Sequence, residues 1–265
     1  MKIIKEILIK IGLYYRLRYS NIYQYYIYKK TPSIAINEQK EISFLTKLLP
    51  PNKLVFDIGA NNGDFTSMYL KLGSTVVAVE PDKTNIQILK ARFGGNQNVI
   101  LLGKAVSNEI GTEELFINGD GSGFNTMSEK WKSSLQDPEI NRWRGTYNFI
   151  KSYRIQTTTV DDMISIYGSP FFIKIDVEGY EHKVITSLTK KINLINFEAN
   201  LPEFHEETIL CVKHLAGIYD EYKFNICDER NFVFDVWKNH MDFCEYVKAT
   251  TRRYLDIWVT ADRTV

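Results

Sequence analysis

The sequence predicts an α/β protein whose core is a doubly wound, Rossmann-like sheet of about seven strands, most of them parallel. Three observations support this fold class. Short apolar runs alternate with helical stretches along most of the 265 residues, as in a sheet whose strands are joined by helices. The runs are apolar at successive positions, which is typical of strands covered on both faces. The composition, 44% hydrophobic and 25% charged, is that of a globular protein and excludes a disordered or collagen-like chain.

Strands and helices are expected to alternate in a regular order. The expected strands are 54–59, 75–80, 98–103, 171–176, 194–198, 223–228 and 254–261. The expected helices between them are 64–72, 84–93, 180–190 and 204–217. The order is therefore β-α-β-α-β, an interruption, and then β-α-β-α-β-β, which right-handed crossovers wind into a sheet with helices on both faces.

The remaining segments form an N-terminal extension and two insertions. Prolines at 32, 50 and 51 bracket a helix around 38–49, because proline marks helix ends. We therefore expect a helical extension over 1–50 and a main domain over 51–265. The insertions are expected at about 112–165, as extended segments around a middle rich in Gly, Ser, Trp and Lys, and at 229–253.

Charge is unevenly distributed between the first 30 residues and the rest of the chain. Residues 1–30 contain seven basic side chains and one acid, a net +6, so the net +1 of the whole chain leaves −5 for 31–265. The same stretch holds seven of the sixteen tyrosines, and residues 2–18 have the spacing of an amphipathic helix. Two interpretations remain open: a helix packed on its own domain, or a peripheral contact with a membrane surface or a partner.

The cysteines and the N-terminus bear on the compartment. Cys211, Cys227 and Cys244 have no spacing typical of metal ligands or of a redox pair, which indicates free thiols in a reducing compartment. Charges interrupt the apolar N-terminal run, and no stretch is apolar over the ~18 residues that a membrane span needs. We expect a cytoplasmic protein, with a peripheral position at the inner membrane face as the alternative.

The most informative stretch, VFDIGANNGDFT at 55–66, is an apolar strand that ends in a glycine turn and opens a helix. Glycine lets main chain approach a ligand, and the first helical turn presents free N–H groups to an anion. A dinucleotide needs the three glycines of G-x-G-x-x-G, whereas only Gly59 and Gly63 remain here. Asp57 would repel a pyrophosphate but favours the sulfonium and amino groups of S-adenosylmethionine. The turn therefore predicts S-adenosylmethionine, with Asp57, Gly59, Asn61 and Gly63 around its methionine part.

The next two strands supply the other candidate cofactor contacts. Twenty-one residues after Gly59, the second strand ends in Glu80, Pro81 and Asp82. An acid at this point accepts hydrogen bonds from both ribose hydroxyls. We expect Glu80 to bind the ribose, and Asp82 and Ala105 to lie on the adenine side.

At this point the chain resembles the FkbM-type S-adenosylmethionine-dependent methyltransferases. The resemblance runs from about 55 to 198 and rests on VFDIGANNGDFT, VVAVEPD, KAVSNEIG, TTTVDDM, and IKIDVEGYEHKVI followed by INFEAN. IKIDVEGYE is the most specific piece, because it combines a strand-end acid with a helix-starting Gly-Tyr-Glu. The resemblance implies a class I methyltransferase domain over 51–265 that methylates hydroxyls, chiefly of sugars and of sugar-like or polyketide compounds. It does not cover 1–50 or much of 119–150.

Polar side chains also follow the fourth and fifth strands, and they should meet at the carboxyl edge of the sheet. The fourth delivers Asp176 with Glu178, and the fifth delivers Glu198 with Asn200. Because an alcohol acceptor must shed a proton, methyl transfer to it needs a base or a metal. We expect Asp176 and Glu198 to contact the acceptor as catalytic groups. The alternatives are Mg²⁺ bound by the oxygens of Asp176, Glu198 and Asn200, or contact of Asp176 with the amino group of the cofactor.

Two histidines are further candidates for a general base. His205 follows the fifth strand, and His182 lies in the first turn after IKIDVEGYE, so either is placed to accept a proton near the acceptor. A surface or helix-capping role is the alternative for both.

The insertions are expected to select the acceptor. Gly119 to Gly123 spells GxGxG, but it neither follows an apolar strand nor opens a helix, so we expect a flexible loop near the acceptor. Four aromatic side chains are candidates for stacking on sugar faces, with core packing as the alternative: Phe124, Trp131, Trp143 and Trp237.

The sequence thus predicts an S-adenosylmethionine-dependent O-methyltransferase that acts on a hydroxyl of a saccharide or glycan precursor. The alternatives are a methyltransferase acting on RNA or a small natural product, a nicotinamide-dependent oxidoreductase, and a non-catalytic binding module. The expected partner is a saccharide acceptor, no nucleic acid is expected, and the oligomeric state is left open.

Overall fold

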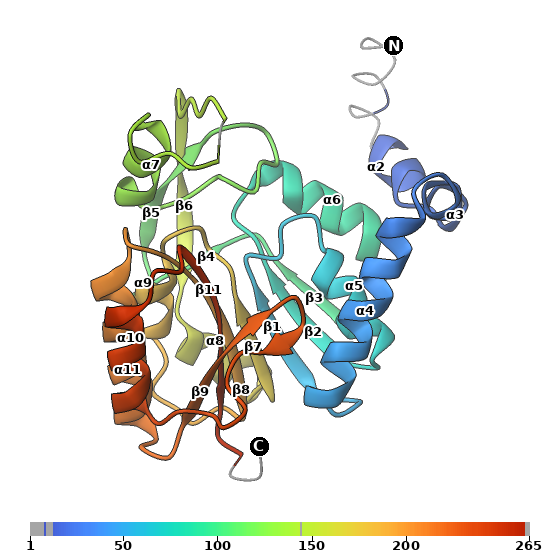
Figure 1. The fold of residues 1–265 in the computed structure, drawn as a ribbon. Coiled ribbons are helices and arrows are strands. Elements are labelled where there is room, and N and C mark those ends of the chain that lie inside the picture. The colour runs from blue at the N-terminus through green and yellow to red at the C-terminus, as the bar shows by residue number, and fades with distance from the viewer. Residues whose placement is uncertain (1–7, 9–12, 144, 263–265) are drawn as a thin grey trace.

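A twisted sheet of eight strands forms the centre of the molecule (Figure 1). The structure, a computed structural model, describes residue 8 and residues 13–143 and 145–262. The strand order is β10-β9-β11-β8-β7-β1-β2-β3. The strands are β1 (Leu54–Ile58), β2 (Thr75–Val79), β3 (Val99–Leu102), β7 (Phe172–Ile175), β8 (Leu194–Asn200), β9 (Lys223–Asp228), β10 (Asn231–Phe232) and β11 (Tyr254–Thr260). All seven expected strands are present, and the short β10 is the addition.

The strand directions confirm a mostly parallel, doubly wound sheet. The neighbouring strands β3, β2, β1, β7 and β8 run parallel, whereas β11 is antiparallel to both β8 and β9. The chain winds outward from β1 to β3 and then returns to the other side of β1 with β7. This reversal between β1 and β7 opens a crevice at the carboxyl ends of the two strands, where ligands bind in such sheets.

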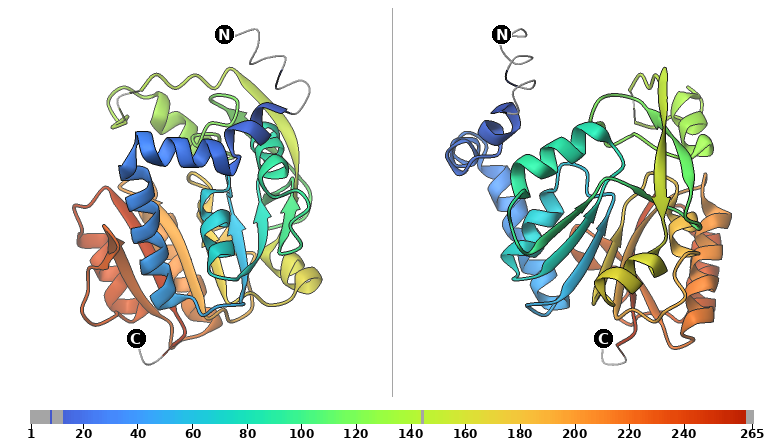
Figure 2. Two further views of the ribbon diagram at one scale, coloured as in Figure 1. Left: turned by 90° about the vertical axis from the view of Figure 1, so that its right-hand side faces the viewer. Right: turned by 180° about the vertical axis from the view of Figure 1, so that it is seen from behind.

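Helices cover both faces of the sheet, and each face has its own core (Figure 2). One face is packed by α4 (Pro32–Leu48), α5 (Asp64–Lys71) and α6 (Lys83–Phe93), and the other by α8 (Val160–Tyr167), α9 (Glu181–Ile185), α10 (His205–Ile218) and α11 (His240–Ala249). Tyr69 of α5 meets Phe172 of β7 with ring centroids 5.7 Å apart. On the opposite face, Phe243 of α11 stacks on Phe224 of β9 at 5.3 Å. The three cysteines are free thiols, as expected.

The mid-chain insertion and the short strand β4 that precedes it form a second, smaller sheet with the order β4-β6-β5. Its strands are β4 (Ala105–Val106), β5 (Thr112–Ile117) and β6 (Lys151–Thr158), so the expected extended segments correspond to β5 and β6. Two helices between 112 and 165 have no counterpart among the expected elements: α7 (Glu129–Gln136) and α8. Each has eight residues and begins at a side-chain cap, Ser128 for α7 and Thr159 for α8. α8 belongs to the helix layer of the main sheet, and α11 fills the expected second interruption.

The N-terminal extension consists of α2 (Leu13–Arg18), α3 (Asn21–Lys30) and α4. α4 begins earlier than expected because Pro32 occupies its first turn, where a missing N–H costs no hydrogen bond. Phe44 of α4 packs edge-on against Trp258 of β11 at 5.4 Å, so α4 is part of the core. Most of the helix expected over 2–18 lies outside the described residues. Among the helices that the structure describes, none is long and apolar enough to cross a membrane.

Candidate active site

A cleft lies at the carboxyl ends of β1, β2 and β7. It encloses about 630 Å³ including its open mouth, within the range of small-molecule sites. Five residues expected from the sequence line it, and they come from four separate segments: Gly59, Asn61, Glu80, Ala105 and Asp176. The topology therefore brings together residues up to 117 positions apart in the sequence.

The glycine turn after β1 is held in shape by contacts within the protein. Gly59 has φ +82°, and a Cβ there would lie 1.7 Å from the main-chain oxygen of Asp176, so a side chain at 59 would displace the β7 end. Gly63, with φ +83°, begins α5, and a Cβ there would meet Phe93 and Leu89 of α6 at 2.5 and 2.6 Å. Gly63 does not line the cleft. Both glycines are thus required by packing, and the expected approach to a ligand concerns Gly59 alone.

Glu80 connects the end of β2 to this turn. Its carboxylate accepts hydrogen bonds from the main-chain N–H groups of Asn61 and Asp82, each at 2.8 Å. The side chain faces the cleft, yet the residue is only 6% exposed. Burial raises the pKa of Glu80 to about 7, although the two N–H donors oppose this shift. The group thus ionises near neutral pH.

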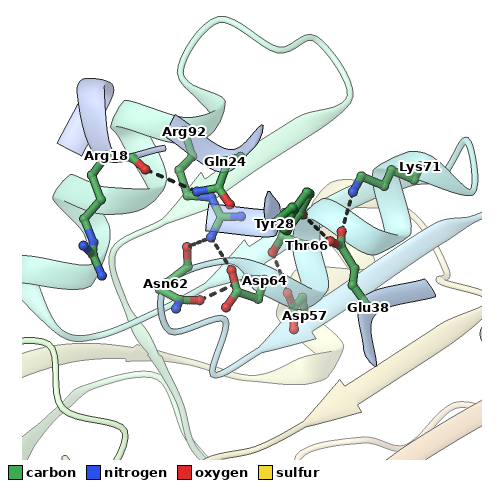
Figure 3. Close-up of polar contacts among 10 residues, drawn as sticks. All are labelled: Arg18, Gln24, Tyr28, Glu38, Asp57, Asn62, Asp64, Thr66, Lys71 and Arg92. Atoms are coloured by element: carbon green, nitrogen blue, oxygen red, sulfur yellow. Dashed lines mark hydrogen bonds and ion pairs between the residues drawn. The ribbon is translucent and has the colours of Figure 1, made fainter. Parts of the chain in front are cut away.

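The two other expected cofactor acids are engaged within the protein. Asp57 is 1% exposed and accepts a hydrogen bond from Thr66 of α5 at 2.5 Å (Figure 3); burial raises its pKa. Asp82 caps α6 by accepting from the N–H groups of Thr84 and Asn85 at 2.8 and 2.9 Å. Neither Asp57 nor Asp82 lines the cleft, and Oδ1 of Asp57 is buried without a hydrogen-bond partner among the described residues.

Asn85 is a cleft residue that the sequence analysis missed. It lies in the first turn of α6, and its Oδ1 is buried without a hydrogen-bond partner among the described residues. A buried, unpaired acceptor at a cleft wall is a ready contact for a ligand donor. The available signal was its position, because the first helical turn after a ribose-type acid faces the same crevice as that acid.

The GxGxG segment forms part of the cleft wall. Ser122 and Gly123 line the cleft, where a flexible loop near the acceptor was expected. Asn125 holds this loop by accepting from the N–H of Asn118 at 2.9 Å and by donating to Asp82 at 3.1 Å. The insertion therefore forms a wall of the cleft next to the glycine turn, because a Cβ at Gly123 would lie 3.4 Å from Asn61 Nδ2.

At the β7 end of the cleft, a buried cation lies against Asp176. Lys174 of β7 is 4% exposed, and its Nζ donates to Asp176 Oδ2 at 2.7 Å. Burial alone would lower the pKa of Lys174, but the carboxylates of Asp176, Glu198 and Asp57 raise it. The lysine therefore remains an ammonium that fixes one oxygen of Asp176.

Glu178 and Glu198 lie near this pair. Burial, followed by the charge of Asp176, raises the pKa of Glu198 to about 8. The same two causes raise the pKa of Glu178, which lines the cleft and accepts from Trp131 Nε1 at 3.1 Å. Glu198 lines a separate cavity of about 250 Å³ together with His182. The acidic edge expected from the sequence is thus present, but its members are divided between two cavities.

The two candidate histidines differ in their surroundings. His205 Nε2 donates to the main-chain oxygen of Val247 in α11, and His205 lines neither cavity. His182 lines the smaller cavity, and burial lowers its pKa. The ring nitrogen of His205 is therefore directed into the packing between α10 and α11, away from the cleft.

Two of the three expected magnesium ligands are engaged by cations of the protein. Asn200 Oδ1 accepts from Arg142 Nη2 at 3.0 Å, and Asp176 Oδ2 accepts from Lys174. Two cations thus occupy one oxygen of Asp176 and the amide oxygen of Asn200, and they would repel a divalent ion. In the part of the chain that the structure describes, no three His, Cys, Asp or Glu side chains are grouped to hold a metal ion.

The aromatic candidates serve mainly as packing. Trp131, 1% exposed, forms a small cluster with Trp143 and Phe204, at ring distances of 4.7 and 5.9 Å. Trp237 packs against Phe232 at 4.7 Å on the α4 side of the sheet. For Trp131 and Trp237 the structure thus supports the core-packing alternative.

The sheet order and the glutamate at the end of β2 define a nucleoside-binding α/β protein. The family described as "Methyltransferase FkbM domain" matches residues 57–247, more than half of the chain. The chain therefore belongs to the FkbM methyltransferase family and is an S-adenosylmethionine-dependent methyltransferase. This confirms the resemblance and excludes the nicotinamide-dependent oxidoreductase.

Solved structures similar to this chain include methyltransferases at low sequence identity. Precorrin-6Y C5,15-methyltransferase from Geobacter metallireducens is 9% identical, with TM-score 0.43 over 83% of this chain and 86% of its own. A TehB-like S-adenosylmethionine-dependent methyltransferase from Corynebacterium glutamicum is 10% identical, with TM-score 0.41 over 84% and 88%. Ribosomal protein L11 methylase from Lactobacillus delbrueckii subsp. bulgaricus is 12% identical, with TM-score 0.41 over 84% and 77%. No curated protein matches the chain.

Proposed function

We propose that the protein transfers a methyl group from S-adenosylmethionine to a hydroxyl of a saccharide or glycan precursor. The observation that carries the proposal is the carboxylate of Asp176, which lines the cofactor cleft and is fixed by Lys174. A sugar hydroxyl is a weak nucleophile that must lose its proton on attack, and a positioned carboxylate can receive that proton.

In this proposal the cofactor lies along the cleft with its ribose at Glu80. Gly59 and Asn61 contact the methionine part, Glu80 accepts from both ribose hydroxyls, and Ala105 lies beside the adenine. The buried oxygen of Asn85 adds an acceptor that the sequence did not suggest. The cleft volume and the unpaired Oδ1 of Asn85 support this fit.

The acceptor oxygen must lie in line with the transferred methyl group. When bound, S-adenosylmethionine supplies the electrophilic carbon. Lys174 holds Oδ2 of Asp176, so the carboxylate has one fixed orientation toward the acceptor. The methyl carbon would leave the sulfonium sulfur of S-adenosylmethionine as the O–C bond forms, and the hydroxyl proton would pass to Asp176 and from there to solvent. Holding the two reactants in line supplies much of the rate enhancement.

The acidic edge favours a saccharide over RNA. Asp176 and Glu178 line the cleft, and Glu198 lies in the adjoining cavity. The carboxylate of Asp176 at the reacting centre would repel the phosphates of RNA, whereas sugar hydroxyls can form hydrogen bonds with it and with Glu178 and Glu198, whose raised pKa values favour the uncharged acids. A small natural product with a free hydroxyl is the remaining alternative.

A methyl-transfer screen tests the proposed function. The full chain is incubated with S-adenosylmethionine carrying a labelled methyl group and with nucleotide sugars, bacterial surface glycans, RNA and non-sugar alcohols. Label is expected in the saccharide fractions and stable to mild base, as an ether is. Label confined to RNA or to the non-sugar alcohols would overturn the saccharide assignment.

The cofactor affinity should depend on pH through Glu80. Because the ribose hydroxyls donate to the ionised carboxylate, binding below pH ~7 requires loss of a proton from Glu80. The dissociation constant of S-adenosylhomocysteine is therefore expected to rise up to about tenfold per pH unit below 7 and to be constant above it. Titration calorimetry from about pH 5.5 to about pH 8.5 measures this dissociation constant. A Glu80→Gln variant should show no such slope, and a wild-type affinity independent of pH would contradict the role of Glu80.

Removal of divalent metal should leave methyl transfer unchanged. Lys174 and Arg142 occupy oxygens of the expected ligand set, so no step is expected to need Mg²⁺. Activity measured after dialysis against EDTA should equal that measured with added Mg²⁺, within about twofold. A loss that Mg²⁺ restores would show that the two cations move aside for a metal.

We infer a peripheral membrane contact for the outer face of α3. Residues 13–30 carry four basic and no acidic side chains. Ile22 and Tyr26 of that face are 85% and 52% exposed, beside the exposed Lys29 and Lys30. Basic and aromatic side chains together suit an anionic lipid surface. Co-sedimentation with vesicles containing phosphatidylglycerol, but not with pure phosphatidylcholine, is expected and should be lost in the K29E/K30E variant. Equal recovery with both vesicle types would contradict the contact.

A further inference from the structure

A second, larger groove lies between the N-terminal helices and the body of the protein. The α2–α3 arm crosses over α5 and α6 (Figure 2), and the groove beneath it encloses about 2300 Å³ including its open mouth. The arm supplies one wall and α5 with the preceding turn supplies the other (Figure 3). The function proposed above does not use this groove.

The lining of the groove combines aromatic rings with hydrogen-bonding groups. Tyr19, Tyr23 and Tyr28 come from the arm. Asn37 comes from α4, and Asn62 comes from the turn that precedes α5. Tyrosine rings offer flat apolar faces with a polar edge, and carboxamides both donate and accept hydrogen bonds. A ligand with apolar C–H faces and many hydroxyls matches this lining.

The charges of the groove are largely paired with one another. Glu38 accepts from Lys71 and from the hydroxyl of Tyr28. Arg92 donates to Asp64 at 2.7 Å.

A third pair joins Arg230 to Glu41 at 2.8 Å, and Arg18 is the remaining charged lining residue. Four cations and three acids therefore leave a net charge of only +1 on the lining. Such a surface gives little attraction to a polyanion such as nucleic acid, which needs many unpaired cations, and little to an acidic peptide.

The groove adjoins the cofactor cleft through one short turn. Asn61 lines the cleft, whereas Asn62 and Asp64 line the groove. Arg92 joins this turn to the arm, because its Nη1 donates to the main-chain oxygen of Asn62 at 2.5 Å and its guanidinium lies 4.5 Å from the ring of Tyr19. A chain-like ligand held in the groove would thus extend along the same turn that borders the reacting centre.

We propose that this groove binds an uncharged stretch of an oligosaccharide acceptor, several sugar units away from the hydroxyl that is methylated. The inference rests on the proposed function. The observations that support it are the ion pairs, the tyrosines and the carboxamides that line the groove. The acceptor class is accordingly an oligosaccharide or polysaccharide and not a free monosaccharide or nucleotide sugar.

A glycan array tests the proposal without requiring turnover. The fluorescently labelled full chain, saturated with S-adenosylhomocysteine, is applied to an array of neutral, uronic-acid-bearing and phosphate-bearing oligosaccharides from one to eight sugar units. Binding to neutral oligosaccharides is expected, increasing with length. Tyr23→Ala and Asn37→Ala should each weaken it by about tenfold. Neither residue belongs to the ion pairs of the groove, and melting curves confirm that the variants fold.

Ile22→Ala is the matched control, because Ile22 lies on the same helix, is 85% exposed and does not line the groove. Its affinity for the array should equal that of the wild type. Binding restricted to charged glycans, binding insensitive to both groove variants, or no glycan binding at all would overturn the groove proposal. An arm-dependent dimer without glycan binding would identify a second copy as the occupant and would overturn it too. Methyl transfer to a monosaccharide alone would support the proposed function and contradict the groove proposal. Glycan binding without any sugar methylation would support the groove proposal and contradict the proposed function.

Discussion

Replacing Asp176 with asparagine is expected to lower kcat by about 10²- to 10⁴-fold, the usual contribution of a positioned general base. The amide keeps the size of the side chain and can still accept from Lys174, but it cannot take the hydroxyl proton. The affinity for S-adenosylhomocysteine should stay within a few-fold of wild type, because the ribose contact at Glu80 is untouched. Single-turnover methyl transfer, measured beside calorimetric cofactor binding, separates the two effects.

Two further substitutions show whether the effect belongs to Asp176. His205→Gln is expected to leave kcat within a few-fold, because the ring contacts Val247 in the packing between helices. Glu198→Gln, in the adjoining cavity, should have a smaller effect than Asp176→Asn. A larger loss in Glu198→Gln would transfer the proton-accepting role to Glu198, and a large loss in His205→Gln would require the ring to leave its place in the structure.

The strands and their succession along the chain could be predicted because the signals are local. Each buried strand is a short apolar run, and a parallel sheet sets the ends of such runs at one edge. Glu80 therefore came to the cleft as expected, although 21 residues separate it from Gly59. The short helices α7 and α8 were missed because eight residues in a mixed segment carry too few periodic positions to stand out.

The partners of individual polar side chains could not be predicted in the same way. Asp57 and Asp82 lie where the motif places them, but Oδ2 of Asp57 accepts from Thr66 and Oδ1 of Asp82 caps the first turn of α6. His205 begins α10 as expected, yet its partner, Val247, is 42 residues further on. Such contacts depend on how helices pack, and the spacing of residues along the chain does not contain that information.

The magnesium prediction illustrates the same difficulty of predicting polar partners, here at the carboxyl edge of the sheet. Asp176, Glu198 and Asn200 are suitable oxygen ligands when considered by residue type alone. Arg142 belongs to the insertion, 58 residues before Asn200, and reaches it only because the insertion folds back over the edge. Lys174 was visible in IKIDVEGYE, and its alternation with Asp176 along one strand placed both on the same face. That alternation was the signal that a cation already accompanied the acid.

Replacing Glu80 with glutamine is expected to weaken S-adenosylhomocysteine binding by about 100-fold. Both oxygens of the carboxylate accept main-chain N–H groups, those of Asn61 and Asp82. The amide must direct its NH₂ at one of these donors, which leaves a buried donor unpaired, and it also loses the charge that attracts the ribose hydroxyls. Each effect is worth about 1–3 kcal/mol, and about 1.4 kcal/mol is a factor of ten. Asp82→Asn is the matched control, since asparagine caps a helix as well as aspartate does, and it should bind within a few-fold of wild type. Equal losses of affinity in the two variants would mean that Asp82 contacts the cofactor directly. No reorientation of the amide satisfies both N–H groups at once, so unchanged binding in Glu80→Gln would show that the nucleoside lies elsewhere.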